Sequence, residues 1–388
     1  MSGHPRSSQS GFTIVELLVA MGVMLVVLAG TTQILSNAMS TQTAAKQMLD
    51  MNSQLRVAMD LVQRDMLQVG QGLPVGRRVG IPNDAGATPI NRPGPAAVGA
   101  CAGVDTFPLD STLPAVTVGA DLGPPINGVC TDVITILAAD NMFGAIPVAA
   151  IGADGTTAVI HNRDLLGAVV NISDNPDVSG DNLRPGDLLM LAKGAASVLM
   201  QVTDVVGQTV TFAAGADDPL GLNQFDMGLA VQGTINQLKA AAPVDPDAPV
   251  VVGGVQRAGP SQATRIRMIT YYVDVDANPM VPRLMRVIGG GQPNAVGMGV
   301  QAFRLTYDIA DQSTNPTSVR MDAGDLAGGG ACSPAPCSEN QIRKVNITMA
   351  MNASQHQAGS LADHGRQSQN TLYTQVSLRS MAFVDRYR

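Results

Sequence analysis

The chain has 388 residues, of which 45% are hydrophobic, 14% are charged and only 3% are aromatic. A formal net charge of −7 at neutral pH argues against broad nucleic-acid binding by the chain as a whole. The 41 glycines and 24 prolines predict many short elements joined by turns, and therefore a β-rich body rather than a helical bundle.

The first element in chain order is a long apolar stretch from Phe12 to Leu35, and no charged residue occurs between Leu17 and Ala45. As a helix, residues 12–35 would measure about 36 Å, which exceeds the hydrocarbon core of a bilayer at about 30 Å. We therefore predict a membrane span. The polar leader at residues 1–11 carries Arg6, which weakly favours a cytoplasmic leader and a periplasmic body.

Glu16 is the one acid within this apolar stretch. A carboxylate inside a membrane segment costs about 2.5–3.5 kcal/mol on insertion scales, and such residues usually have a partner. The natural partner this close to a chain start is a free amino group, on the same helix or on a neighbouring one. That partner requires a chain beginning just before the acid, as cleavage after Gly11 would provide.

Residues 11–16 read Gly-Phe-Thr-Ile-Val-Glu and resemble the class III signal of type IV prepilins. The resemblance implies that a prepilin peptidase, which is also an N-methyltransferase, cuts after Gly11 and methylates Phe12. It also implies that Glu16 aligns each subunit in a growing filament. Many major pilins carry a proline further along this helix, and this sequence has none there.

Two simpler interpretations of the apolar stretch remain open. One is an ordinary single-pass anchor, and the other is a secretory signal cleaved after the small residues Ser36 to Ala38. Both fit a carboxylate within the apolar region poorly, and neither requires the junction between Gly11 and Phe12.

The helix is predicted to continue past the membrane, covering residues 12–70, and to end at the Gly/Pro-rich residues 70–74. Its second half is amphipathic, because apolar side chains repeat there mostly at spacings of three and four. These are Met48, Met51, Leu55, Ala58, Met59, Val62, Met66 and Val69. We predict that this stripe packs on the protein's own sheet.

Two antiparallel β blocks are predicted beyond the helix, so the expected fold class is α+β: a long helix packed on a β-rich, pilin-like head. The first block, residues 71–262, begins with a loop region at 71–130 and ends with a linker at 213–262. Its predicted strands cover residues 131–138, 183–191, 197–206 and 208–212, with a hairpin at Gly207. The second block, residues 263–388, has predicted strands at 264–275, 283–288, 296–307, 341–351 and 372–383, with a turn at 276–279.

The order of these segments resembles the PilW group of large minor pilins. The resemblance rests on residues 131–136, 185–189, 269–273 and 376–380 behind a prepilin leader. It implies a non-enzymatic subunit of the inner membrane, and later of the pilus at the cell surface, that helps initiate or cap pilus assembly. The implied partners are other minor and major pilins, the inner-membrane assembly platform and membrane lipid.

Two other functions stay open. The larger minor pseudopilin of type II secretion shares the leader and the plan of the head. A pilus-tip adhesin or DNA-binding module could also use the loops at 71–130 or 213–262.

The four cysteines, Cys101, Cys130, Cys332 and Cys337, are compatible with disulfides if the body lies outside the cytoplasm. Three connectivities exist. We favour the pairs 101–130 and 332–337, because each closes a local loop within one Gly/Pro-rich region. A zinc site is less well supported, because no second pair of ligands lies near Cys332 and Cys337 in sequence, and free thiols remain possible.

No set of residues in the sequence predicts catalysis, a cofactor or a metal site. Three of the histidines, His161, His356 and His364, fall in predicted loops. The run from Asp274 to Asn278 mimics the start of a calcium loop, but proline stands at its sixth position where glycine is needed. A hairpin turn explains that run better, and calcium on the acidic loops remains a weak alternative.

Overall fold

In a computed structural model, the residues described are 11–74, 77–82, 87–108, 111–140, 143, 145–161, 172, 183–193, 196–224, 233–235, 238, 250–252, 255–257, 261–275, 281–309, 317–319, 339–352 and 369–381. The chain divides into two compact units, residues 1–52 with 353–368, and residues 53–352 with 369–388. The first unit contains the N-terminal part of a long helix, and the second contains the rest of that helix and the strands. The predicted α+β class is confirmed.

Helix α1 covers Ile14–Leu67, so it starts two residues later and ends three residues earlier than predicted. Its end is set by the turn that follows, where Gly70 adopts a φ of 72° that favours glycine. The Gly70 N–H leaves the helical pattern and donates to the carbonyl of Leu137 at 2.9 Å. Between residues 12 and 35 the large apolar side chains are exposed, from 84% at Phe12 to 57% at Leu35.

The predicted apolar stripe is buried over most of its length. In the second unit its buried members are Leu55, Ala58, Met59, Val62, Met66 and Val69. In the first unit Met51 is buried, whereas Met48 is 42% exposed and so lies outside the buried stripe.

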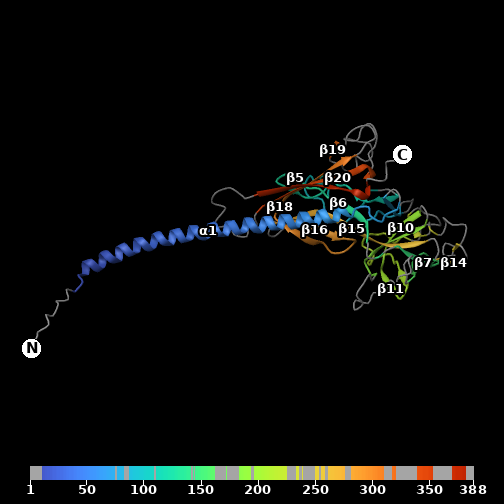
Figure 1. Ribbon diagram of the computed structural model, residues 1–388, viewed down its shortest axis with the longest axis horizontal. Coiled ribbons are helices and arrows are strands. Elements are labelled where there is room, and N and C mark those ends of the chain that lie inside the picture. The colour runs from blue at the N-terminus through green and yellow to red at the C-terminus, as the bar shows by residue number, and fades with distance from the viewer. Residues whose placement is uncertain are drawn as a thin grey trace, which may run out of the picture. The chain divides into compact units, whose positions relative to one another are not determined.

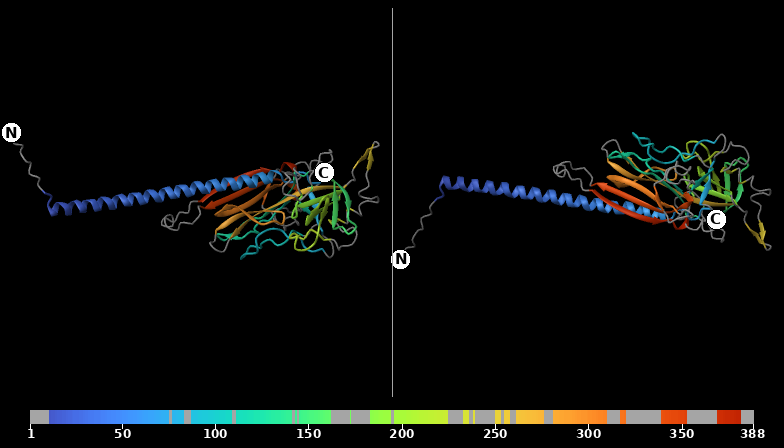
Figure 2. Two further views of the ribbon diagram at one scale, coloured as in Figure 1. Left: turned by 90° about the horizontal axis from the view of Figure 1, so that it is seen from below. Right: turned by 90° about the horizontal axis from the view of Figure 1, so that it is seen from above.

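Residues 53–67 of α1 contact both sheets of the second unit. A Cβ added at Gly297 would lie 3.4 Å from the Cβ of Ala58, so the backbone of one sheet approaches the helix closely. The Gln63 side chain donates to the Thr374 hydroxyl of the other sheet. Both views in Figure 2 show the orange-red C-terminal strands alongside this part of α1. The prediction that the stripe packs on the protein's own sheet is confirmed.

The larger sheet has eleven strands and is organised around β15 (Gln262–Val275), which pairs with β6, β7, β9 and β16. The strand order is β10-β9-β15-β7-β8-β12-β11, with β3, β6, β16 and β17 attached beside this path. Their bounds are β3 Val116–Thr117, β6 Ile134–Ala139, β7 Ile146–Ile151, β8 Thr157–Ile160, β9 Leu188–Lys193, β10 Ala196–Gln201, β11 Asp204–Val206, β12 Thr209–Thr211, β16 Pro282–Ile288 and β17 Asn294–Met298.

The smaller sheet has four strands in the order β19-β18-β20-β21, with bounds Thr317–Val319, Val300–Ile309, Ile342–Asn352 and Gln369–Ser377 (Figure 1). The alternation predicted for β20 is present. Val345, Ile347, Met349 and Met351 are fully buried. On the opposite face Asn346 is also buried. Its polar side chain is satisfied there, because its amide donates to Asp308 at 2.7 Å and its oxygen accepts from Tyr373 and Gln375.

Three small two-stranded sheets correct the predicted loop regions. Strands β1 (Arg78–Gly80) and β2 (Thr112–Pro114) pair, as do β4 (Pro125–Ile126) and β5 (Val129–Cys130), all within the predicted loop at 71–130. Strands β13 (Val250–Val252) and β14 (Val255–Arg257) pair within the predicted linker at 213–262. Runs of two or three residues are too short to show a strand periodicity, so the sequence patterns do not reveal them.

Several predicted strands have different limits. The strand predicted at 296–307 is two strands, β17 and β18, because Gly299 between them has a φ of 72°. The strand predicted at 197–206 divides into β10 and β11, and the last predicted strand stops at Ser377, before the 3-10 turn η4 (Arg379–Met381). The hairpin predicted at Gly207 is confirmed by the pairing of β11 with β12. The turn predicted at 276–279 lies outside the described residues.

The larger sheet crosses the predicted border at residue 262, because β6 and β9 from the first block pair with β15 from the second. The division of the chain into a leader, a helix and two β regions remains a prediction. A second 3-10 turn, η2 (Glu339–Gln341), leads into β20.

Candidate processing and assembly site

The N-terminus of α1 is closed by a reciprocal pair of side chains. The Glu16 N–H donates to the Thr13 hydroxyl oxygen at 3.3 Å, and Glu16 Oε2 accepts from the Thr13 N–H at 3.4 Å and from its hydroxyl at 3.3 Å. This is a capping box, in which the acid at the third helical position satisfies a backbone donor that the helix cannot. The residue types, Thr followed three positions later by Glu, signal such a box in the sequence, and Thr13 was missed there as a functional residue.

The capping box uses only one carboxylate oxygen of Glu16. Within the described residues, Glu16 Oε1 has no hydrogen-bond partner, so it can accept a donor from outside the helix. The box also lies downstream of the junction between Gly11 and Phe12, and cleavage of that bond would leave it intact. Gly11 and Phe12 are both exposed, and a Cβ added at Gly11 would meet no atom within 4 Å. Leader residues 1–10 lie outside the described residues.

Among the described residues, one helix, α1, is long and apolar enough to cross a membrane. Its most apolar window of 18 residues has a mean hydropathy of 2.4, and none of it is buried by the residues that the structure describes. Contact between so large an apolar surface and water is unfavourable, so a lipid phase or another protein must cover these side chains.

A second group of residues fixes the other end of α1 to the head. Asp65 is 3% exposed, and its Oδ2 accepts from the Tyr271 hydroxyl at 2.5 Å and from Arg286 Nε at 2.7 Å. Burial raises the pKa of the Tyr271 hydroxyl, and the negative charge of Asp65 raises it further, so the hydroxyl remains a proton donor. Burial lowers the pKa of Arg286, but the bonds to Asp65 and Tyr271 more than compensate, and the pKa is raised overall.

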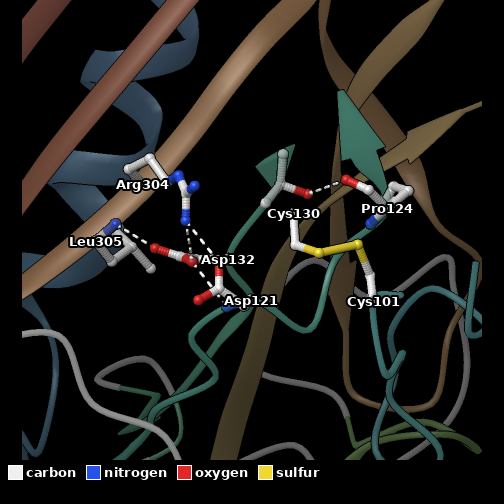
Figure 3. A network of polar contacts seen from close by, with 8 residues as sticks. Cys101, Asp121, Pro124, Cys130, Asp132, Arg304 and Leu305 are labelled. Atoms are coloured by element: carbon white, nitrogen blue, oxygen red, sulfur yellow. Dashed lines mark hydrogen bonds and ion pairs between the residues drawn. A yellow bond between two sulfur atoms is a disulfide. The ribbon is translucent and has the colours of Figure 1, made fainter. Parts of the chain in front are cut away.

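A third group joins the chain before β6 to the smaller sheet (Figure 3). Asp132 is fully buried, and its two carboxylate oxygens accept from the Asp121 N–H at 3.0 Å and the Leu305 N–H at 2.6 Å. Arg304 Nη1 lies 2.7 Å from Asp121 Oδ1 and 3.6 Å from Asp132 Oδ1. The buried charge of Asp132 is therefore compensated by two backbone donors and a guanidinium.

Next to this group, Cys101 and Cys130 form a disulfide with a Cα–Cα distance of 5.7 Å (Figure 3). This is the first of the two pairs favoured from the sequence. The second pair, Cys332 and Cys337, lies outside the described residues.

The disulfide closes a loop with a sequence separation of 29 residues. Its loss in a Cys101→Ser, Cys130→Ser double variant is expected to lower the unfolding free energy by about 2–4 kcal/mol, mainly because the unfolded chain gains freedom. Urea unfolding followed by tyrosine fluorescence, compared with the parent chain, measures this change. An unchanged midpoint would show that the loop is held by its other contacts.

The other groups considered for chemistry do not form a site within the described residues. His161 is exposed, and Asp274 pairs with Arg283 at 3.2 Å. His356, His364 and the run from 276 to 279 lie outside the described residues. Among the side chains that the structure describes, no group of three or more His, Cys, Asp or Glu residues could hold a metal ion.

Comparison with known proteins gives one match. Residues 6–32 match the family model described as the prokaryotic N-terminal methylation motif. No curated protein and no solved structure matches the chain. The matched segment contains the Gly11–Phe12 junction, the capping box and the start of the apolar helix. The chain therefore carries the N-terminal methylation motif of the type IV pilin and pseudopilin class, which implies processing by a prepilin peptidase.

Proposed function

We propose that the chain is a minor type IV pilin of the large, PilW-like kind, which helps to initiate or cap a pilus and has no enzymatic role. In this proposal a prepilin peptidase removes the leader after Gly11 and methylates Phe12. The observation that carries it is the methylation motif at residues 6–32, whose only acid, Glu16, keeps one oxygen without a partner among the described residues.

The exposed half of α1 supports assembly through the helix. Its apolar side chains must be covered by lipid while the subunit is in the inner membrane, and by the helices of other pilins once it joins a filament. In both places Glu16 lies in apolar surroundings, and the new amino group of a neighbouring subunit can donate to its Oε1. This contact would fix the depth at which each helix enters the filament.

The size of the head supports a specialised subunit. The second unit, residues 53–352 with 369–388, contains the two larger sheets and the C-terminal part of α1, and so large a head would crowd neighbours in a regular shaft. A position at the tip avoids that crowding. The head would lie in the periplasm before assembly and at the cell surface afterwards.

Mass spectrometry of the mature N-terminus tests the processing step. We expect a chain that begins with N-methylated Phe12. A chain that begins after Ala38 would overturn the proposal, because it requires a different cleavage signal. A chain that still begins with Met1 would overturn it as well, because no prepilin peptidase has then cut after Gly11.

The methylation motif is shared with pseudopilins of type II secretion, which form a short filament in the periplasm. Shearing of whole cells separates the two functions. A pilus subunit is expected in the sheared surface fraction, and a pseudopilin stays with the cells.

A further inference from the structure

The head contains a small hollow of about 240 Å³ on the side of β15 and β16 that faces away from α1. Tyr271 of β15 points to the helix and bonds Asp65, so its neighbour Tyr272 points to the opposite face, as successive strand residues do. Tyr272 and Val287 line the hollow from these strands, and residues 91–94, 219–220, 290–291 and 293 line it from the loops.

Arg92 lines this hollow and is only 5% exposed. Its Nε donates to the Thr135 hydroxyl at 3.0 Å, Nη1 to the Val118 carbonyl at 3.1 Å, and Nη2 to the Thr117 carbonyl at 3.0 Å. All three acceptors are neutral. A guanidinium has five N–H donors, so each Nη keeps one N–H without an acceptor in the part of the chain that the structure describes.

The charge of Arg92 is not balanced by an acid. No carboxylate pairs with its guanidinium among the described residues, and its Cζ lies 5.8 Å from the centre of the Phe107 ring. Burial lowers the pKa of Arg92 to about 10, so the group stays protonated at neutral pH. Buried charges are normally paired, and a lone buried cation beside a hollow attracts an anion.

Tyr272 supplies a second unused donor. Its side chain is 6% exposed, and its hydroxyl has no hydrogen-bond partner among the described residues. Burial raises the pKa of the Tyr272 hydroxyl, and the negative charge of Asp274 raises it further, so the hydroxyl keeps its proton at neutral pH. The neighbouring Tyr271, in contrast, has its hydroxyl bonded to Asp65 at 2.5 Å.

The rest of the lining is largely apolar and closely packed. It includes Pro93, Pro219, Leu220 and Pro293. A Cβ added at Gly290 would lie 2.7 Å from Pro219 Cγ, so the turn at Gly290 approaches the facing loop as closely as glycine permits. Apolar walls with a few converging donors are typical of sites for small organic ligands.

We propose that this hollow binds a carboxylate carried on a small apolar body, held by the guanidinium of Arg92 and the hydroxyl of Tyr272. The apolar body lies against the prolines, Leu220 and Val287. The ligand is either a free organic acid or the carboxylate of a polypeptide segment. This inference is independent of the filament function, since it rests only on residues of the head.

The test uses the full chain in detergent micelles and sodium benzoate as the probe, with benzamide as its neutral counterpart. Ligand-observed NMR titration is expected to show saturable binding of benzoate and binding of benzamide weaker by at least about tenfold, because a hydrogen bond to a charged group is worth more than a neutral one. N-acetylphenylalanine, which mimics the end of a polypeptide, distinguishes the two sources: tighter binding than benzoate indicates a polypeptide, and weaker binding a free acid.

The Tyr272→Phe variant removes only the unpartnered hydroxyl, so its thermal midpoint should match that of the parent chain while benzoate binds at least about tenfold more weakly. Tyr373→Phe is the matched control, because its hydroxyl bonds Asn346 on the smaller sheet, away from the hollow, and its loss should not change benzoate affinity. Equal binding of benzoate and benzamide, no saturable binding, or equal affinity in folded Tyr272→Phe would overturn the proposal.

Discussion

Replacing Asp65 by alanine is expected to destabilise the head by about 3–5 kcal/mol, because it removes one partner from a buried ion pair. Arg286, whose side chain is 15% exposed, would lose its carboxylate, and the Tyr271 hydroxyl would lose its acceptor. Urea unfolding of the full chain in detergent, followed by the fluorescence of its five tyrosines, measures the loss without interference, since the chain has no tryptophan.

Two variants make this prediction specific to the buried group. Asp60→Ala, on an exposed position of the same helix, should change the unfolding free energy by no more than about 0.5 kcal/mol. Tyr271→Phe keeps the ion pair and should cost less than Asp65→Ala, about 1.5–3 kcal/mol. Equal stability of Asp65→Ala and Asp60→Ala would mean that the pair contributes nothing to holding α1 in the head.

The Glu16→Gln variant is expected to be cut after Gly11 as efficiently as the parent chain, yet to reach the filament at least about tenfold less well. Glutamine at this position can still complete the capping box, so the helix start is kept. Only the negative charge is lost, and with it the attraction to the amino group of a neighbouring subunit in apolar surroundings. Mass spectrometry reports the cleavage, and immunoblotting of sheared filaments reports the incorporation.

Variants of Thr13 separate charge from helix capping. Thr13→Ser keeps a hydroxyl and should assemble normally, whereas Thr13→Val loses the cap at a cost of about 1 kcal/mol but keeps the acid. If assembly depends on the charge, Thr13→Val will assemble far better than Glu16→Gln. The reverse order would assign the role of Glu16 to capping and refute the intersubunit contact.

The parts of the fold that the sequence predicts well are those with a long local pattern. The apolar run from Phe12 is long enough to be identified as a membrane helix by its length, and the stripe from Leu55 to Val69 repeats at helical spacings over several turns. Strands β7 and β8 were missed, because β7 contains Pro147 and two alanines and β8 has only four residues. A short strand is defined by its partners in the sheet, and those partners are distant in sequence.

The candidate site shows the same limit. The junction of Gly11 and Phe12 and the acid at Glu16 follow from a contiguous motif, and the Thr13 signal was present in the same residues. Asp65 and Tyr271 are separated by 206 residues, and no spacing rule connects them. Arg92 and Tyr272 line the same hollow only through the packing of loops on the outer face of the larger sheet, so the hollow has no signature in the sequence.

The bond between Gln63 and Thr374 has a consequence for the timing of folding. These residues are 311 positions apart, so the strand that contacts the helix is made long after the helix itself. At about 5–20 residues per second, synthesis of that interval takes about 15–60 s. Throughout this delay the side of α1 that packs on the smaller sheet lacks its cover from β21, and β6 has already had to wait for β15, which follows it by more than a hundred residues. The newly made subunit is therefore most exposed to proteolysis and to wrong partners before its last strand is complete.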